Sequence, residues 1–232
     1  MPGSLRRLYT DPGEYVDCDH ADVIAYAKSI VAEDAADHEK ARLLFLAVRD
    51  DVHYQPYLDL QDPSNYRASG VLARRQGQCI GKAALYAAVC RAHGLPARVG
   101  FADVQNHLAT KKLREAMGST TFYWHGYAEV YVESEWRKAT PTFNTTLCAK
   151  FGVAPLDFDG RNDALLHAFD GAGRQFMHYV TDHGAFNDVP TKFLMREMER
   201  NYPGLVSLNA TSRDMEQEAA EEFAPEAIGH GQ

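Results

Sequence analysis

The stretch ARRQGQCIGKAALYAAVCRAHGLPARVGF, residues 73–101, places a cysteine where a Gly-Gln turn opens a predicted helix. Small residues dominate that helix, as expected of a helix buried on several sides, and Gly94 and Pro96 predict its end. The first turn of a helix carries unpaired N–H groups and partial positive charge, and this environment lowers the pKa of a thiol. Cys79 is therefore a candidate nucleophile, whereas Cys90 in the same helix is predicted to fill the core.

The composition of the 232 residues is that of a globular protein, with 45% hydrophobic and 11% aromatic residues. No apolar run reaches the roughly 18 residues of a membrane helix, and the N-terminal segment lacks the apolar stretch of a signal peptide. A net charge of −8 argues against nucleic-acid binding, which needs a basic face. We expect a cytoplasmic protein without membrane or nucleic-acid partners, and the sequence leaves the oligomeric state open.

The cysteine and histidine spacings do not predict a metal site. His178 and His183 are five positions apart, but no cysteine or carboxylate stands at ligand spacing from them. We therefore expect no metal and no other cofactor. None of the cysteines forms a C-x-x-C pair and nothing indicates export, so free thiols are expected at Cys18, Cys79, Cys90 and Cys148.

The order of predicted elements indicates an α+β fold. Apolar residues at helical spacing predict helices over 23–33, capped by Asp19 or Asp22, and over 38–52, opened by Asp37. Three strands should follow the Cys79 helix, over 97–104, 121–132 and 135–144. The last two are expected to form a hairpin around residues 133–135, and helices followed by antiparallel strands are typical of α+β proteins.

The segments outside this core carry weaker signals. Residues 107–118 are a polar insertion with helical character, residues 155–173 are loop-like with a short helix, and residues 191–202 are helical. We expect one domain over residues 1–207 and an acidic, partly disordered tail over 208–232.

A cysteine nucleophile needs a base, and the best candidate is His125 in the segment FYWHGYAEV. If the strand alternates, His125 shares a face with Tyr123 and Tyr127. The alternative to a catalytic role is a structural histidine whose hydrogen bonds are made within an aromatic cluster of the core. The small neighbour Gly126 leaves room for a helix end or a substrate to approach, which favours the functional reading.

Three blocks of sequence, VRDDVHYQP, ASGVLARRQGQCIGKAALYAAVCRAHGLPARVGF and HGYAEVYVESEWRKATPT, resemble the transglutaminase-like superfamily. They lie in the family's order within residues 37–144, which is more specific than any single motif. The resemblance implies a papain-like core in which the nucleophile helix packs on an antiparallel sheet, with extra helices at both ends. It also implies that Cys79 is the nucleophile and His125 the base, with Gly77 and Gln78 in the preceding turn.

The family's acidic residue is missing from this pattern, because Thr140 stands where the family has an aspartate before Pro141. A threonine hydroxyl can accept the histidine N–H but cannot stabilise imidazolium by charge. Other residues could orient the base in place of the missing aspartate or contact the substrate. Asn144, Asp157 and Asp159 are possible orienters of the base, and Gln78 and Trp124 are possible oxyanion or substrate contacts.

The resemblance implies a cysteine-dependent enzyme that attacks an amide through a thioester, as a protease, amidase, deamidase or transglutaminase does. A protein or peptide substrate is expected. The alternative is a non-catalytic module that binds a protein or peptide and has lost the acidic residue. A metal-dependent hydrolase that uses the downstream histidines is a third possibility.

Overall fold

The structure is a computed structural model that describes residues 1–106, 111–165 and 177–209. Its strands are β1 (His53–Tyr54), β2 (Gln76–Gly77), β3 (Ala97–Asn106), β4 (Thr121–Val132), β5 (Glu135–Ala139) and β6 (Met177–Phe186). Its helices are α1 (Gly3–Leu8), α2 (Ala21–Ile30), α3 (Asp37–Asp51), the 3-10 turn η1 (Pro63–Tyr66), α4 (Ala68–Arg74), α5 (Cys79–Ala92), α6 (Lys111–Met117), α7 (Thr145–Phe151), α8 (Thr191–Asn201) and α9 (Pro203–Asn209).

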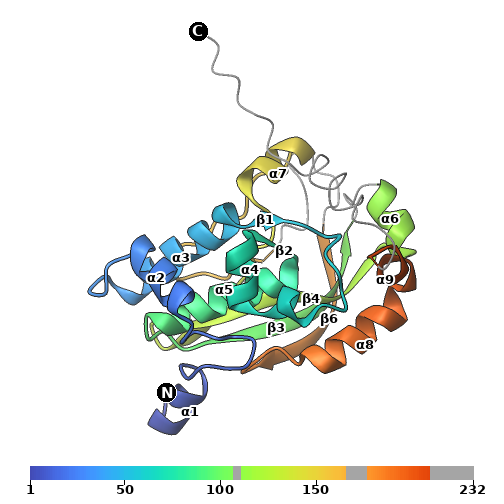
Figure 1. The fold of residues 1–232 in the computed structure, drawn as a ribbon. Coiled ribbons are helices and arrows are strands. Elements are labelled where there is room, and N and C mark those ends of the chain that lie inside the picture. Colours follow the sequence, from blue (N-terminus) through green and yellow to red (C-terminus); the bar gives the residue numbers. More distant parts are fainter. Residues whose placement is uncertain (107–110, 166–176, 210–232) are drawn as a thin grey trace.

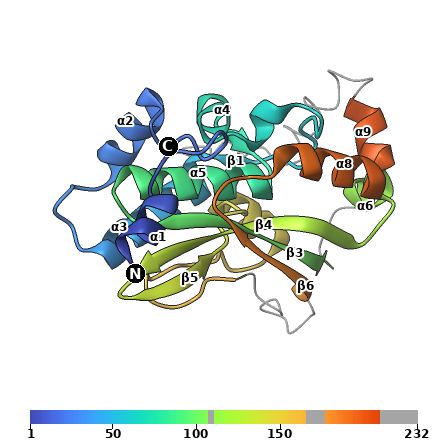
Figure 2. The same cartoon turned by 90° about the horizontal axis from the view of Figure 1, so that it is seen from below.

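The centre of the fold is an antiparallel sheet covered on one face by α5. The strand order is β5-β4-β3-β6, and Figures 1 and 2 show α5 lying along this sheet with α2, α3 and α4 on its other sides. The short strands β1 and β2 pair in parallel just before α5 begins. The predicted α+β architecture, with a nucleophile helix on an antiparallel sheet and further helices at both ends, is confirmed.

The small residues of α5 allow three neighbouring helices and the sheet to approach it closely. Every residue from Cys79 to Arg91 is buried, including Lys82, which is fully enclosed. The Lys82 ammonium donates to the carbonyl oxygens of Arg49 (2.9 Å) and Val52 (2.6 Å), and these bonds satisfy carbonyls at the end of α3. Burial lowers the pKa of Lys82 to about 7. Helix α3 therefore runs past α5 with its C-terminus beside the Cys79 end.

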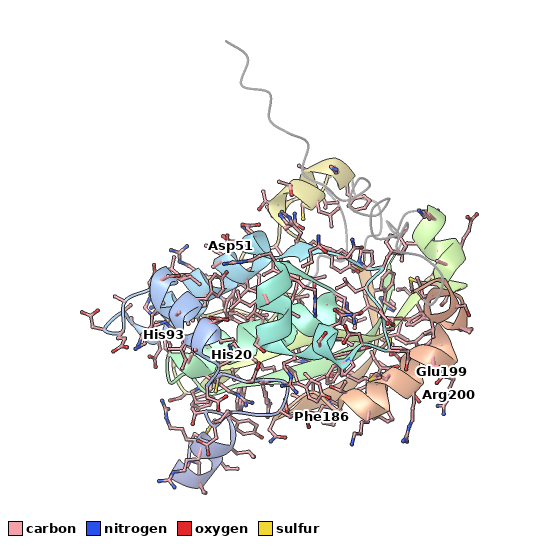
Figure 3. All side chains as sticks on the ribbon, viewed as in Figure 1. His20, Asp51, His93, Phe186, Glu199 and Arg200 are labelled. Atoms are coloured by element: carbon pink, nitrogen blue, oxygen red, sulfur yellow. The ribbon has the colours of Figure 1, made fainter. Side chains whose placement is uncertain are left out.

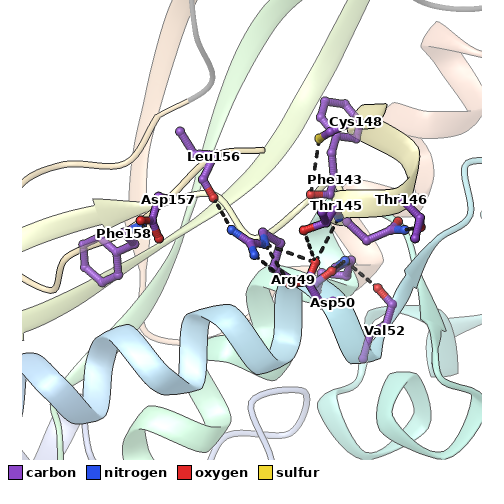
Figure 4. Close-up of polar contacts among 12 residues, drawn as sticks. Arg49, Asp50, Val52, Phe143, Thr145, Thr146, Cys148, Leu156, Asp157 and Phe158 are labelled. Carbon is purple, nitrogen blue, oxygen red and sulfur yellow. Dashed lines mark hydrogen bonds and ion pairs between the residues drawn. The ribbon is translucent and has the colours of Figure 1, made fainter. Parts of the chain in front are cut away.

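The end of α3 also holds the segment that follows the sheet hairpin. Asp50 Oδ1 accepts hydrogen bonds from the N–H and the hydroxyl of Thr145, both at 2.9 Å, and Arg49 donates to the Leu156 carbonyl at 2.8 Å (Figure 4). These long-range contacts fix α7 and the irregular segment after it, although neither has a strong local signal in the sequence.

Most of the predicted elements form, with specific corrections. The hairpin turns at Glu133 and Ser134, which both have positive φ, as a tight two-residue turn requires. The N-cap of α2 is His20, whose Nδ1 accepts the Asp22 N–H at 3.3 Å; neither Asp19 nor Asp22 caps it, because Asp22 already lies in the first turn. Residues 155–165 contain no helix, and the remainder of the loop predicted over 155–173 and nearly all of the 208–232 tail lie outside the described residues.

Several elements of the structure have no predicted counterpart, among them α1, α4, α7, β6 and α9. Strand β6 forms the edge of the main sheet, and most of its side chains are exposed or half-buried. An exposed edge strand lacks the apolar alternation by which strands are recognised, and this one also contains Gly184 with φ +83°. None of the helices in the described part of the chain is both long and apolar enough to cross a membrane.

Candidate active site

Cys79 is the first residue of α5, as the sequence predicted, and its thiol lies at the wall of a pocket. The N-cap residue Gln78 has an extended backbone, and its side chain makes no capping hydrogen bond. The unpaired N–H groups of the first turn are therefore left for other acceptors. A tetrahedral oxyanion formed on Cys79 would meet these donors.

The protonation state of Cys79 differs from the expectation based on helix position alone. Burial raises the pKa of the thiol from 9.0 to about 11, while the N–H groups of Gly126, Ile80 and Cys79 itself act in the opposite direction with a smaller effect. The side chain is only 9% exposed. Desolvation of the thiolate thus outweighs the favourable field of the helix end, and the resting form in this closed structure is the neutral thiol.

The sheet approaches Cys79 at Gly126, which confirms the expectation that this small residue admits a helix end. A Cβ atom at Gly126 would lie 2.6 Å from Cα of Ile80 and 3.1 Å from the carbonyl carbon of Cys79. Any larger residue would push the first turn of α5 away from β4. The contact therefore fixes Cys79 at the height of His125, the preceding residue on the strand.

His125 lines the same pocket as Cys79 and is 4% exposed. Its Nε2 is buried and has no hydrogen-bond partner among the described residues. Burial lowers the pKa of His125 from 6.5 to about 4, so the imidazole is neutral at neutral pH. The site thus brings together a neutral thiol and a neutral imidazole with a free nitrogen.

A β-bulge directly before His125 interrupts the alternation that the sequence analysis assumed. Phe122 pairs with Val104 and His125 with Ala102, so that Tyr123 and Trp124 together stand opposite Asp103. Trp124 has φ +57°, a left-handed conformation that is unfavourable for a bulky residue. Bulges of this kind redirect the side chains beside them, here at the candidate base.

Contacts from three elements hold the bulge. Asp103 Oδ1 accepts the Trp124 N–H at 3.0 Å and faces His183 Nε2 at 2.8 Å. The Trp124 ring stacks on His183 with a centroid separation of 3.9 Å, and its Nε1 donates to Glu197 at 3.3 Å. Trp124 also lines the Cys79 pocket. The sequence carries no signal for this cluster, because its members are 14 to 94 positions apart and meet only through the sheet and α8.

Thr140 is buried, with 1% exposure, and its hydroxyl has no hydrogen-bond partner among the described residues. The hydrogen bond from His125 to Thr140 that the family pattern suggested is therefore not formed here. The paired residues of β4 and β5 end at Ala128 and Ala139, three positions short of His125. Thr142, which the sequence analysis did not single out, has an equally buried and unpartnered hydroxyl.

The other candidate orienters are engaged elsewhere. Asn144 Oδ1 accepts the N–H of Tyr54 at 3.2 Å, and its amide nitrogen contacts Thr146. Asp157 accepts the N–H of Phe158, and Asp159 accepts the N–H groups of Arg161 and Asn162. Asp159 precedes Gly160, which lies against His38 at the start of α3 and therefore at the opposite end of α5 from Cys79.

Gln78 contributes an unpartnered hydrogen-bond donor to the pocket. Its side chain is 7% exposed, and the amide nitrogen has no hydrogen-bond partner among the described residues. A buried amide without a partner costs free energy, which a bound carbonyl oxygen would recover. Within the described ranges, no group of three or more His, Cys, Asp and Glu side chains is arranged to hold a metal ion, and His183 is bonded to Asp103.

Three solved structures are similar to part of this chain. A search of curated proteins found no match. A candidate cysteine protease from Cytophaga hutchinsonii shares 19% identity over 61% of this chain, with a TM-score of 0.46. A candidate protease from Parabacteroides distasonis shares 12% over 62% (TM-score 0.36), and a structure described as a TGase shares 20% over 57% (TM-score 0.37). The chain spans 43%, 26% and 32% of the lengths of these three proteins.

The family assignment comes from the sequence. The pattern of the transglutaminase-like superfamily matches residues 24–141, which is just over half of the chain. The match includes Cys79, His125 and Thr140 and ends before α7. The chain therefore belongs to the transglutaminase-like superfamily.

Proposed function

We propose that this protein catalyses acyl transfer from an amide or a related acyl donor through a thioester on Cys79, with His125 as the base. The observation that carries the proposal is the shared pocket, which Cys79 at the start of α5 and His125 both line, with His125 Nε2 free of any hydrogen-bond partner among the described residues. The family and its protease-like and transglutaminase-like neighbours support cysteine-dependent chemistry in general.

The chemistry begins from neutral groups. His125 takes the proton from Cys79 as the sulfur bonds to the carbonyl carbon, so that charge appears only as imidazolium and oxyanion. The N–H groups of the first turn of α5 stabilise the oxyanion. Collapse breaks the bond to the leaving amine, which takes the proton from His125. Water or a second amine then attacks the thioester and releases the thiol.

One observation favours the non-catalytic alternative, a binding module on the same fold. No carboxylate or amide bonds to the His125 ring in the described part of the chain, and Thr140 carries no charge. Without an orienting partner, the tautomer and orientation of the imidazole depend on packing alone. This arrangement would lower the rate of a cysteine–histidine pair without removing the nucleophile.

The time course of hydrolysis of activated acyl esters tests the proposal. We expect an initial burst of leaving group, equal to one acyl group per protein, followed by slower turnover. Cys79→Ala should abolish both phases, and Cys90→Ala should retain them, because Cys90 lies in the core of the same helix. Binding of a peptide without any Cys79-dependent burst would favour the binding module.

A further inference from the structure

The Cys79 pocket has apolar walls supplied mainly by parts of the chain outside the nucleophile helix. Leu113 and Met117 of α6, Met198 of α8, and Leu205 of α9 line it together with aromatic residues of β4. All four are buried. The C-terminal helices α8 and α9 lie beyond the segment that matches the family.

Direct contacts hold α8 and α9 against β4 and α6 beside the pocket. The hydroxyl of Tyr202, at the junction of α8 and α9, donates to the Thr121 carbonyl at 3.2 Å and accepts the N–H of Tyr123. A Cβ at Gly204 would lie 2.5 Å from the carbonyl oxygen of Ala116, so α9 touches α6 directly. The charged residues Glu199 and Arg200 of α8 are exposed and point away from the fold (Figure 3).

The described residues that line the pocket carry no charge unless the His125 imidazole is protonated. Among the described residues that line the pocket there is no Lys, Arg, Asp or Glu. A charged group that entered would lose its hydration without gaining a partner of opposite charge. An apolar group would lose water favourably, and the unpartnered amide nitrogen of Gln78 would donate to its carbonyl oxygen while His125 Nε2 stays available as the base.

We propose that this pocket selects a compact, uncharged acyl group with a linear aliphatic or aromatic tail, which packs against the apolar side chains of α6, α8 and α9 while its carbonyl reaches Cys79. The proposal rests on the proposed acyl-transfer function and narrows its donor. Cys79 Sγ bonds to the acyl carbon, the bond to the leaving group breaks, and the thiol proton passes through His125 to the leaving group.

The dependence of kcat/KM on the acyl chain of the donor tests the proposed donor class directly. We would compare p-nitrophenyl acetate, hexanoate and monosuccinate, together with a glutamine-containing dipeptide as a peptide donor, by kcat/KM. Burial of each added methylene is expected to raise kcat/KM by roughly fourfold until the pocket is full. Hexanoate should therefore exceed acetate by at least about tenfold, and the charged succinyl donor should fall below both.

A matched pair of variants places the selectivity in this pocket. Met198→Ala enlarges it, whereas Met195→Ala removes the same side chain from the same helix at a half-buried position that does not line it. Met198→Ala should shift the preferred chain from hexanoate towards octanoate by several-fold in the ratio of kcat/KM values, and Met195→Ala should leave that ratio unchanged. Because both kcat/KM values are measured on the same protein sample, their ratio does not depend on the fraction of protein that is folded.

The outcomes separate the donor class from the reaction. Cys79-dependent turnover without preference for the apolar chain, or with the dipeptide as the only donor, overturns the pocket assignment and leaves acyl transfer standing. The same holds if both methionine variants change the ratio equally. Absence of any Cys79-dependent reaction with every donor removes the proposed function and this inference together.

Discussion

Ile80 lies so close to Gly126 that no side chain fits between them: a Cβ on Gly126 would stand 2.6 Å from Cα and 2.9 Å from the nitrogen of Ile80. The obstructing atoms belong to the backbone of the first turn of α5 and cannot rotate away. This one contact joins the helix that carries the candidate nucleophile to the strand that carries the candidate base.

Gly126→Ala is therefore expected to separate Cys79 from His125. The first turn of α5 must move, at a cost of about 1–3 kcal/mol of folding free energy, and Cys79-dependent activity should fall more than stability does. Urea unfolding and ester burst kinetics measure the two effects. Gly3→Ala is the control, because a Cβ at Gly3 meets no atom within 4 Å. Unchanged kinetics in Gly126→Ala would mean that the contact does not position the site.

Asp103→Ala should release the bulge at Trp124. The carboxylate accepts the Trp124 N–H and contacts His183, and its loss leaves a half-buried donor unsatisfied, at a cost of about 1 kcal/mol. Because Trp124 precedes His125, kcat should fall as well. Asp163→Ala is a matched control, since Asp163 also accepts a strand N–H, but from Lys138, which does not line the pocket as Trp124 does. Equal activity loss in both variants would contradict a specific role for the bulge.

The buried His125 predicts a stability that falls in mild acid. Its pKa is lowered in the folded state, so between pH 6.5 and pH 4 the unfolded chain binds a proton that the folded chain does not. This stabilisation is complete above pH 6.5 and is lost as the pH falls towards 4. From pH 7 to pH 5, His125 alone should remove about 2 kcal/mol of unfolding free energy.

Urea unfolding at the two pH values checks this effect. His125→Gln should remove that part of the pH dependence, and His20→Gln, at an exposed helix cap, should retain it. A wild-type stability that is flat over this interval, or equally changed by both substitutions, would show that His125 is accessible to protons in the folded state.

Thr140→Asp should restore a charged partner for the base. A carboxylate beside His125 is expected to raise its pKa by about one unit or more, which an NMR titration of the imidazole measures. Thr142→Asp is the matched variant, because Thr142 is as buried and its hydroxyl also has no partner. If the pKa of His125 rises only in Thr142→Asp, residue 142 and not residue 140 is the one that lies beside the imidazole. No rise in either would show that this segment does not face His125.

The sequence predicted the elements whose information is local. Residues 73–101 contain the turn, the small-residue helix and the following strand in one run, and the hairpin at Glu133 and Ser134 follows from its two flanking strands. The position of Cys79 at a helix start follows from residues 73–101 as well. These features depend on near neighbours, and the family pattern supplied the long-range pairing of Cys79 with His125.

Features that depend on tertiary contacts were missed. The pKa of Cys79 follows from burial under helices distant in sequence, which outweighs the local effect of the helix end. The left-handed Trp124 is held by Asp103 and cannot be inferred from a residue type that avoids this conformation. The apolar walls from α8 and α9 come from short segments whose positions are set by Tyr202 and Gly204.

The central claim is that Cys79 is a nucleophile assisted by His125, and the most direct measurement is the alkylation rate of each cysteine in the native protein at pH 7.5. Burial raises the pKa of Cys18, Cys79 and Cys148 to about 11 and that of Cys90 to about 12, so thiol acidity alone predicts little selectivity among them. With a small uncharged alkylating agent, Cys79 should react at least about tenfold faster than the other three, and His125→Gln should remove that advantage. A Cys79 rate equal to those of Cys18 and Cys148, or one unchanged by His125→Gln, would contradict the claim.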